Sequence, residues 1–108
     1  MKTGKKLFHV QGTDRRISMI AQHYGVTHQL NKTLEELFEL FIAILKLRLM
    51  IFLGHEKQAH FVHMYEEISD VRIMIDQVEV LTGSSARYRE IRESKLERQL
   101  TRIQTEAK

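Results

Sequence analysis

The sequence predicts an all-α fold, a helical bundle of about four helices in one domain. None of the 108 residues is proline, so the residue that breaks helices most strongly is missing. Gly25, Gly54 and Gly83 each follow a segment rich in apolar residues, and glycine is the residue that most readily ends a helix. A hydrophobic fraction of 43% and a charged fraction of 29% are ordinary for a globular domain of this length.

The four expected helices follow from these start and stop signals. Asp14 or Thr13 can cap the first, which runs to about Tyr24. The second runs from about residue 27 to 53 and the third from about 57 to 82. The fourth starts after Ser84 or Ser85, either of which can cap it, and runs nearly to the C-terminus. An imperfect apolar stripe marks the fourth helix: Tyr88, Ile91, Leu96, Leu100 and Ile103. Residues 1–12 are expected to form a flexible basic arm, and residues 13–108 the helical domain.

The segment Leu37–Leu53 is unusually apolar, because fourteen of its seventeen residues are hydrophobic. A membrane span requires roughly 20 such residues, and Glu39, Lys46 and Arg48 interrupt this run, so a membrane protein is not expected. A helix that is apolar nearly all round must be covered nearly all round. The bundle is therefore expected to be completed by oligomerisation, as a homodimer or homotetramer.

Charge and cysteine content limit the classes of partner and site. The chain has no cysteine, which excludes disulfides and thiolate metal sites. The N-terminal segment has no apolar stretch typical of a secretion signal, so a cytoplasmic location is expected.

Residues 17–85 contain five basic and nine acidic side chains, whereas residues 86–108 contain seven basic and four acidic ones. An acidic middle makes nucleic acid an unlikely partner unless a metal sits on it.

Two short acidic motifs carry the chemistry that the sequence indicates. Glu36 and Glu39, and likewise Glu67 and Asp70, are spaced i, i+3, so each pair projects from one side of its helix. Apolar residues surround both pairs, and like charges beside a packed surface repel one another. Mg²⁺, which takes oxygen ligands, would offset that repulsion. Such pairs are also common on solvated helix faces, so the pattern alone leaves both interpretations open.

These motifs resemble those of a known family. Residues 32–40 are similar to the first motif, ExxE, of the all-α MazG-like nucleotide pyrophosphohydrolases, and residues 66–77 are similar to their second motif, ExxD. The resemblance covers residues 29–81 well and extends more weakly to residues 95–103, which are similar to a basic final helix of phage and Gram-positive relatives. Arg72 departs from the pattern, since relatives usually have an apolar residue there.

The resemblance implies an activity and a set of ligands. Such enzymes hydrolyse a nucleoside triphosphate between its α and β phosphates, which yields the monophosphate and pyrophosphate. Glu36, Glu39, Glu67 and Asp70 would bind Mg²⁺, or Mn²⁺ in its place, and one of these carboxylates could serve as general base. The metal would neutralise phosphate charge and lower the pKa of a water that it binds.

Basic and aromatic side chains could complete a nucleotide site. Lys95 and Arg98, one turn apart, are candidates for binding the outer phosphates, and a solvated helix face is the alternative. Gln29 and Lys32 precede Glu36 by one to two turns and could line the nucleotide pocket, although the favoured interpretation of both is an exposed helix start. The chain has no tryptophan, so Tyr24, His28 or Phe38 would have to stack on a base.

Two other interpretations fit parts of the sequence. His60, His63 and Glu67 share a helix face, but three ligands on one helix close a zinc tetrahedron poorly, so His63 is expected to be a neighbour of Glu67 or a surface residue. The main rival function is a non-enzymatic helical module that binds a protein or nucleic acid through the basic C-terminal helix. An intact set of inward-facing carboxylates distinguishes the enzyme from such a module, which requires none.

Overall fold

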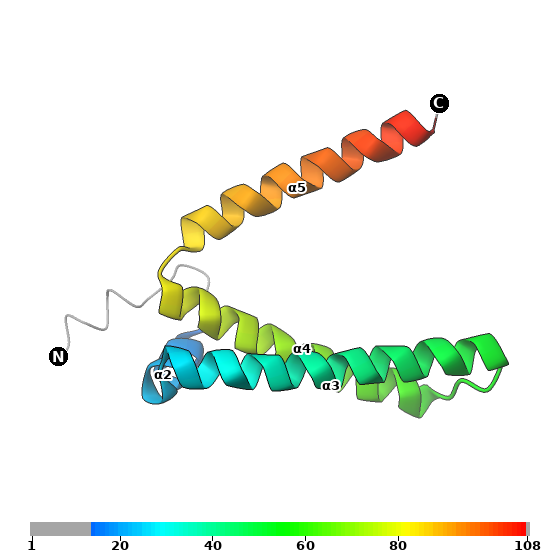
Figure 1. Cartoon of the computed structure of the whole chain (residues 1–108), viewed down its shortest axis with the longest axis horizontal. Coiled ribbons are helices and arrows are strands. Elements are labelled where there is room, and N and C mark those ends of the chain that lie inside the picture. Colours follow the sequence, from blue (N-terminus) through cyan, green and yellow to red (C-terminus); the bar gives the residue numbers. More distant parts are fainter. Residues whose placement is uncertain (1–13, 108) are drawn as a thin grey trace.

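A computed structural model describes residues 14–107 of the chain and contains four helices in that part (Figure 1). They are α2 (Arg15–Tyr24), α3 (Val26–Leu53), α4 (Gln58–Thr82) and α5 (Ser85–Glu106). The described residues include no strand, which confirms the all-α fold class. The expected arm, residues 1–12, lies outside the described residues.

The helix ends follow the local signals in the sequence. Asp14 caps α2, because its Oδ1 atom accepts a hydrogen bond of 2.9 Å from the backbone N–H of Arg16. Gly54 ends α3 and Gly83 ends α4 in the left-handed conformation, with φ angles of 73° and 65°. A residue with a side chain would be strained at these angles, so each glycine fixes the point where its helix stops.

An antiparallel pair of long helices, α3 and α4, forms the body of the fold, and α2 packs across one end of it (Figure 1). The core lies along the contact of these three helices. Its apolar members are Ile17, Ala21, Ala43, Leu47, Val71, Met74 and Val80. Ala21 and Ala43 are small, which lets the helix backbones approach closely where they cross.

One face of α3 is covered and the opposite face is not. The covered face carries Glu36, Ala43 and Leu47, which point towards α4. At roughly 100° per residue, a line of large apolar residues lies on the other side of the helix. This outer stripe of α3 consists of Leu34, Phe38, Phe41, Leu45, Leu49 and Phe52, which are exposed by 50% (Leu49) to 79% (Phe52). Within residues 14–107, the most apolar helix is therefore covered on one side only.

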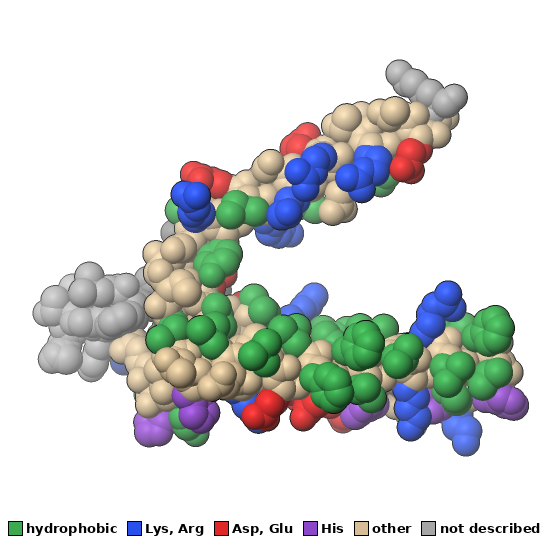
Figure 2. Space-filling model, viewed as in Figure 1, with side chains coloured by type: hydrophobic (Ala, Val, Ile, Leu, Met, Phe, Trp, Pro, Cys, Tyr) green, Lys and Arg blue, Asp and Glu red, His purple; other side chains and the backbone are tan. Residues whose placement is uncertain are grey.

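The last helix diverges from the rest of the fold. Among the described helices, α5 packs against α4 alone, and it has no buried residue. Figure 2 shows open space between α5 and the α3–α4 pair, with apolar side chains on the face of the pair that is turned towards α5. No helix in the described part of the chain is long and apolar enough to cross a membrane.

Candidate functional site

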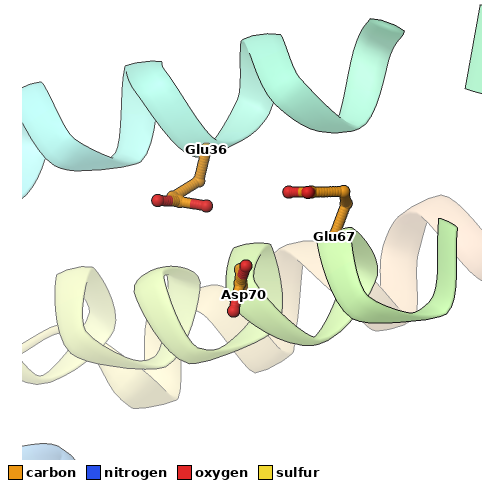
Figure 3. Close-up of side chains that lie close together, drawn as sticks. All are labelled: Glu36, Glu67 and Asp70. Atoms are coloured by element: carbon orange, nitrogen blue, oxygen red, sulfur yellow. The ribbon is translucent and has the colours of Figure 1, made fainter. Parts of the chain in front are cut away.

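Three of the predicted ligands meet between the two long helices. Glu36 projects from α3, and Glu67 and Asp70 project from α4 (Figure 3). Each offers a carboxylate oxygen, and these oxygens all lie within 4.8 Å of one another. The antiparallel packing of α3 on α4 brings the two motifs to the same level, although 31 residues separate Glu36 from Glu67 in the sequence.

The carboxylate cluster, as we call Glu36, Glu67 and Asp70, is partly withdrawn from water. Glu36 is only 8% exposed, Glu67 is half-buried and Asp70 is exposed. The Oε1 atoms of Glu36 and Glu67 are buried and have no hydrogen-bond partner within the described part of the chain. A buried acceptor without a partner is costly, and adjacent carboxylates also repel one another. Hard oxygen ligands in this arrangement suit Mg²⁺ or Mn²⁺, which would relieve both costs.

Two cationic or potentially cationic groups border the cluster. The Nζ atom of Lys32 lies 3.2 Å from Oε2 of Glu36 and 3.4 Å from Oε1 of Glu35. These carboxylates, Glu36 first, raise the pKa of Lys32 above its ordinary value, so the ammonium form is favoured. The Nε2 atom of His63 lies 3.9 Å from Oε2 of Glu67. His63 is therefore the neighbour of Glu67 that its spacing indicated.

The fourth predicted ligand, Glu39, lies elsewhere. It is exposed on α3 and does not belong to the carboxylate cluster. A separation of three residues turns a side chain about 60° around the helix relative to its predecessor. Since Glu36 points directly at α4, that rotation carries Glu39 out of the contact and towards solvent.

A groove adjoins the cluster along α2, α3 and α4. Its volume is about 710 Å³, and Lys32 belongs to its wall as well as to the border of the cluster. Gln29 also lines it, so both residues predicted for a nucleotide pocket lie in one groove. The rings of Tyr24 and His28, which line it too, are stacked with their centres 4.6 Å apart. Phe38, the third aromatic candidate, belongs to the outer stripe of α3.

A buried amide pair supports the groove. Gln29 and Gln77 are 3% and 2% exposed, and both line the groove. Nε2 of Gln29 donates a hydrogen bond of 2.6 Å to Oε1 of Gln77. Sequence reasoning missed Gln77 as a site residue. A signal was present, because Gln77 continues the spacing of Val71 and Met74 on the buried face of α4 and is the polar member of that series.

Comparison of the chain with protein-family models, with curated proteins and with solved structures finds no match. The carboxylate cluster, the groove beside it and the motif resemblance are therefore the features that indicate a function.

The predicted phosphate-binding residues are remote from this site in a single chain. Lys95 and Arg98 are exposed on α5. Because α5 packs against α4 alone among the described helices and diverges from the pair (Figure 1), the structure does not bring these two residues to the carboxylate cluster. Lys32 is the lysine that it places there.

Proposed function

We propose that this protein is a Mg²⁺-dependent, MazG-like hydrolase that cleaves a nucleoside triphosphate between its α and β phosphates. The products are the nucleoside monophosphate and pyrophosphate. The observation that carries the proposal is the pair of buried, unpartnered oxygens of Glu36 and Glu67, which lie beside Asp70 and between two helices. A purely structural contact has no need of such oxygens, whereas a divalent cation requires them.

The residues of the carboxylate cluster have distinct roles in the proposed site. Glu36, Glu67 and Asp70 hold the cation, and the exposure of Asp70 leaves a side open to phosphate oxygens and water. Bound Mg²⁺ supplies charge neutralisation and a lower pKa for water. Mn²⁺ would serve in the same role. One carboxylate of the site accepts the proton of the attacking water.

The groove accommodates the nucleoside part of the substrate. A volume of about 710 Å³ lies in the range of about 300–1,000 Å³ that is usual for small-molecule sites. The stacked rings of Tyr24 and His28 offer a flat surface to a base. Lys32, at the boundary between the groove and the cluster, is placed to meet the phosphate chain. In this arrangement the base lies in the groove, the phosphate chain lies beside Lys32, and the metal lies at the carboxylate cluster.

Oligomerisation is part of the proposal. The exposed outer stripe of α3 supports a homodimer or a homotetramer, because a surface of this kind is rare on a stable monomer. Lys95 and Arg98 could act on phosphates only if another arrangement of chains brought them to a site.

An alternative function has one observation in its favour. The unburied α5 carries basic and apolar side chains, as a non-enzymatic module for protein or nucleic-acid binding would. The deciding experiment incubates the protein with mixed ribo- and deoxyribonucleoside triphosphates and Mg²⁺, and identifies the products by chromatography. Pyrophosphate with a monophosphate supports the proposal. Inorganic phosphate with a diphosphate would indicate a different hydrolase, and absence of turnover would favour the module. Glu67→Gln, purified in the same way, controls for contaminating enzymes.

A further inference from the structure

The two glutamates of the carboxylate cluster have the same local surroundings. In both Glu36 and Glu67, the Oε1 atom is buried and has no hydrogen-bond partner within the described part of the chain. The Oε2 atom of each faces a basic side chain that lies four residues earlier on the same helix. Nζ of Lys32 is 3.2 Å from Oε2 of Glu36, and Nε2 of His63 is 3.9 Å from Oε2 of Glu67. One oxygen of each carboxylate is thus engaged, and the other is not.

Helix geometry explains this shared arrangement. Residues at i and i+4 are neighbours on one side of an α-helix, and side chains lean towards the N-terminus of their helix. Each glutamate therefore leans towards the basic residue one turn before it. Because α3 and α4 run antiparallel, Lys32 and His63 lie at opposite ends of the cluster, and Figure 3 shows the carboxylates of Glu36 and Glu67 between the two helices. The outer oxygens are thus held from two sides, which leaves the buried Oε1 atoms for a ligand between the helices.

Lys32 has enough donors to hold Glu36 and still meet a phosphate. An ammonium group carries three N–H bonds. Oε2 of Glu36 and Oε1 of Glu35, at 3.2 and 3.4 Å from Nζ, account for two of them. No further acceptor in the described part of the chain contacts this Nζ atom, so the third N–H is available to the groove that Lys32 lines. A role in orienting Glu36 is therefore compatible with the phosphate contact proposed above.

We propose that Lys32 and His63 are positioning residues of the metal site, which hold Oε2 of Glu36 and of Glu67 so that Oε1 of each is aimed at the divalent cation. The inference rests on the proposed function, because it concerns the ligands of that site. Carboxylates that bind a metal are usually held by such outer contacts, and loss of one lowers metal affinity roughly 10- to 100-fold. Asp70 differs, since it is exposed and has no ion pair in the described part of the chain. It is the ligand that remains free to adjust when phosphate binds.

A purely electrostatic effect of the two bases predicts the opposite result. A positive charge a few ångströms from a cation site repels the cation, so removal of Lys32 would then strengthen metal binding. If Lys32 instead orients Glu36, its removal lets the carboxylate turn and weakens metal binding. The sign of the change in metal affinity therefore distinguishes the two roles. The side chains of Lys32 and His63 are 45% and 54% exposed, so substitutions there leave the packing of α3 on α4 in place.

Calorimetric titration of the full chain with Mn²⁺ measures this sign, and without nucleotide no phosphate contact contributes to it. Lys32→Met keeps the apolar stem but removes the ammonium group, and it should weaken Mn²⁺ binding roughly 10-fold or more. Lys32→Arg keeps a cationic donor and should bind Mn²⁺ nearly as the parent does. Lys46→Met is the matched control, because it removes the same charge from the same helix about 15 Å beyond Glu36. It should leave the Mn²⁺ affinity nearly unchanged.

The same test can be repeated on the other helix. His63→Met should also weaken Mn²⁺ binding, but by a smaller factor, because 3.9 Å exceeds the length of a direct hydrogen bond. His63→Gln keeps an N–H donor and should recover part of that loss. His55→Met, an exposed histidine outside the cluster, is the control. With two helices tested, the inference does not depend on the folding of a single variant.

The outcomes separate this inference from the proposed function. Thermal unfolding followed by circular dichroism identifies the variants that are folded. If the parent binds Mn²⁺ and the folded Lys32→Met and His63→Met variants bind it equally or more tightly, the two bases do not orient the ligands, and the inference is wrong while the metal site stands. If the parent binds neither Mn²⁺ nor Mg²⁺, the metal site itself is wrong, and the proposed function falls together with the inference.

Discussion

Gln29 of α3 and Gln77 of α4 are joined by a hydrogen bond of 2.6 Å between their side-chain amides, and the two residues are 97% and 98% removed from solvent. This bond ties the two long helices together beneath the groove. Within α3, the Oγ1 atom of Thr33 donates a hydrogen bond of 2.6 Å to the backbone carbonyl of Gln29. The floor of the groove is therefore held by polar contacts and not by apolar packing alone.

Breaking this amide pair should destabilise the fold. Gln77→Leu leaves the Nε2 donor of Gln29 buried without its acceptor, which should cost about 1–3 kcal/mol in urea unfolding. Gln29→Leu should behave similarly. The double variant removes both polar groups and should be more stable than the sum of the single effects predicts. Additive losses would show that the two amides do not act as a pair.

The sequence was sufficient to predict the helices and their ends, because the residues that start and stop a helix act locally. Three glycines and a capping aspartate set most of the ends, and the observed bounds differ from the expected ones by about a residue. It was also sufficient to select Glu36, Glu67 and Asp70, because spacing within each motif is a local property. The exclusion of Glu39 from the cluster depends on the rotation of α3 about its axis, which packing against α4 determines. The direction of α5 follows from the short connection after Thr82 and from its contact with α4, neither of which helical spacing predicts.

Asp14 should make the stability of α2 depend on pH at the acidic end. Hydrogen bonds from the side chain and backbone of Arg16 lower the pKa of Asp14 from 3.8 to about 2. The native state thus binds this proton less readily than the unfolded state does. The stabilisation is present above the ordinary pKa and is lost as pH falls from about 4 towards 2. Asp14→Asn keeps a capping oxygen but should remove this part of the pH dependence, measured by thermal unfolding followed by circular dichroism. An unchanged profile would mean that the cap does not form in solution.

Metal binding and stability should respond in opposite directions to neutralisation of the cluster. Glu67→Gln removes one of the charges that repel Glu36 and Asp70, so the metal-free protein should become more stable. The same substitution removes a ligand, so calorimetric titration with Mg²⁺ or Mn²⁺ should show sharply weaker binding. Glu39→Gln, in an exposed carboxylate outside the cluster, is the matched control and should change both quantities little. Equal loss of metal affinity in the two variants would instead place Glu39 among the ligands.

Removal of the metal should also affect activity. A chelator should abolish the hydrolysis of the triphosphate, and added Mg²⁺ should restore it.

Kinetics should separate the cluster from its basic border. Loss of Glu67 removes metal charge from the transition state, so Glu67→Gln should reduce kcat roughly a thousandfold or more, about 4 kcal/mol of barrier. Lys32 meets phosphate in the proposed site, and a hydrogen bond to a charged group contributes about 1.5–3 kcal/mol, so Lys32→Met should lower kcat/KM by roughly 10- to 150-fold. Lys46→Met, on the same helix but remote from the groove, should leave kcat/KM nearly unchanged.

Lys95→Met tests whether α5, as well as Lys32, supplies positive charge to the phosphates. If α5 contributes no phosphate contact, this variant keeps the parent's kcat/KM, and a loss comparable to that of Lys32→Met would show that α5 of some copy reaches the site.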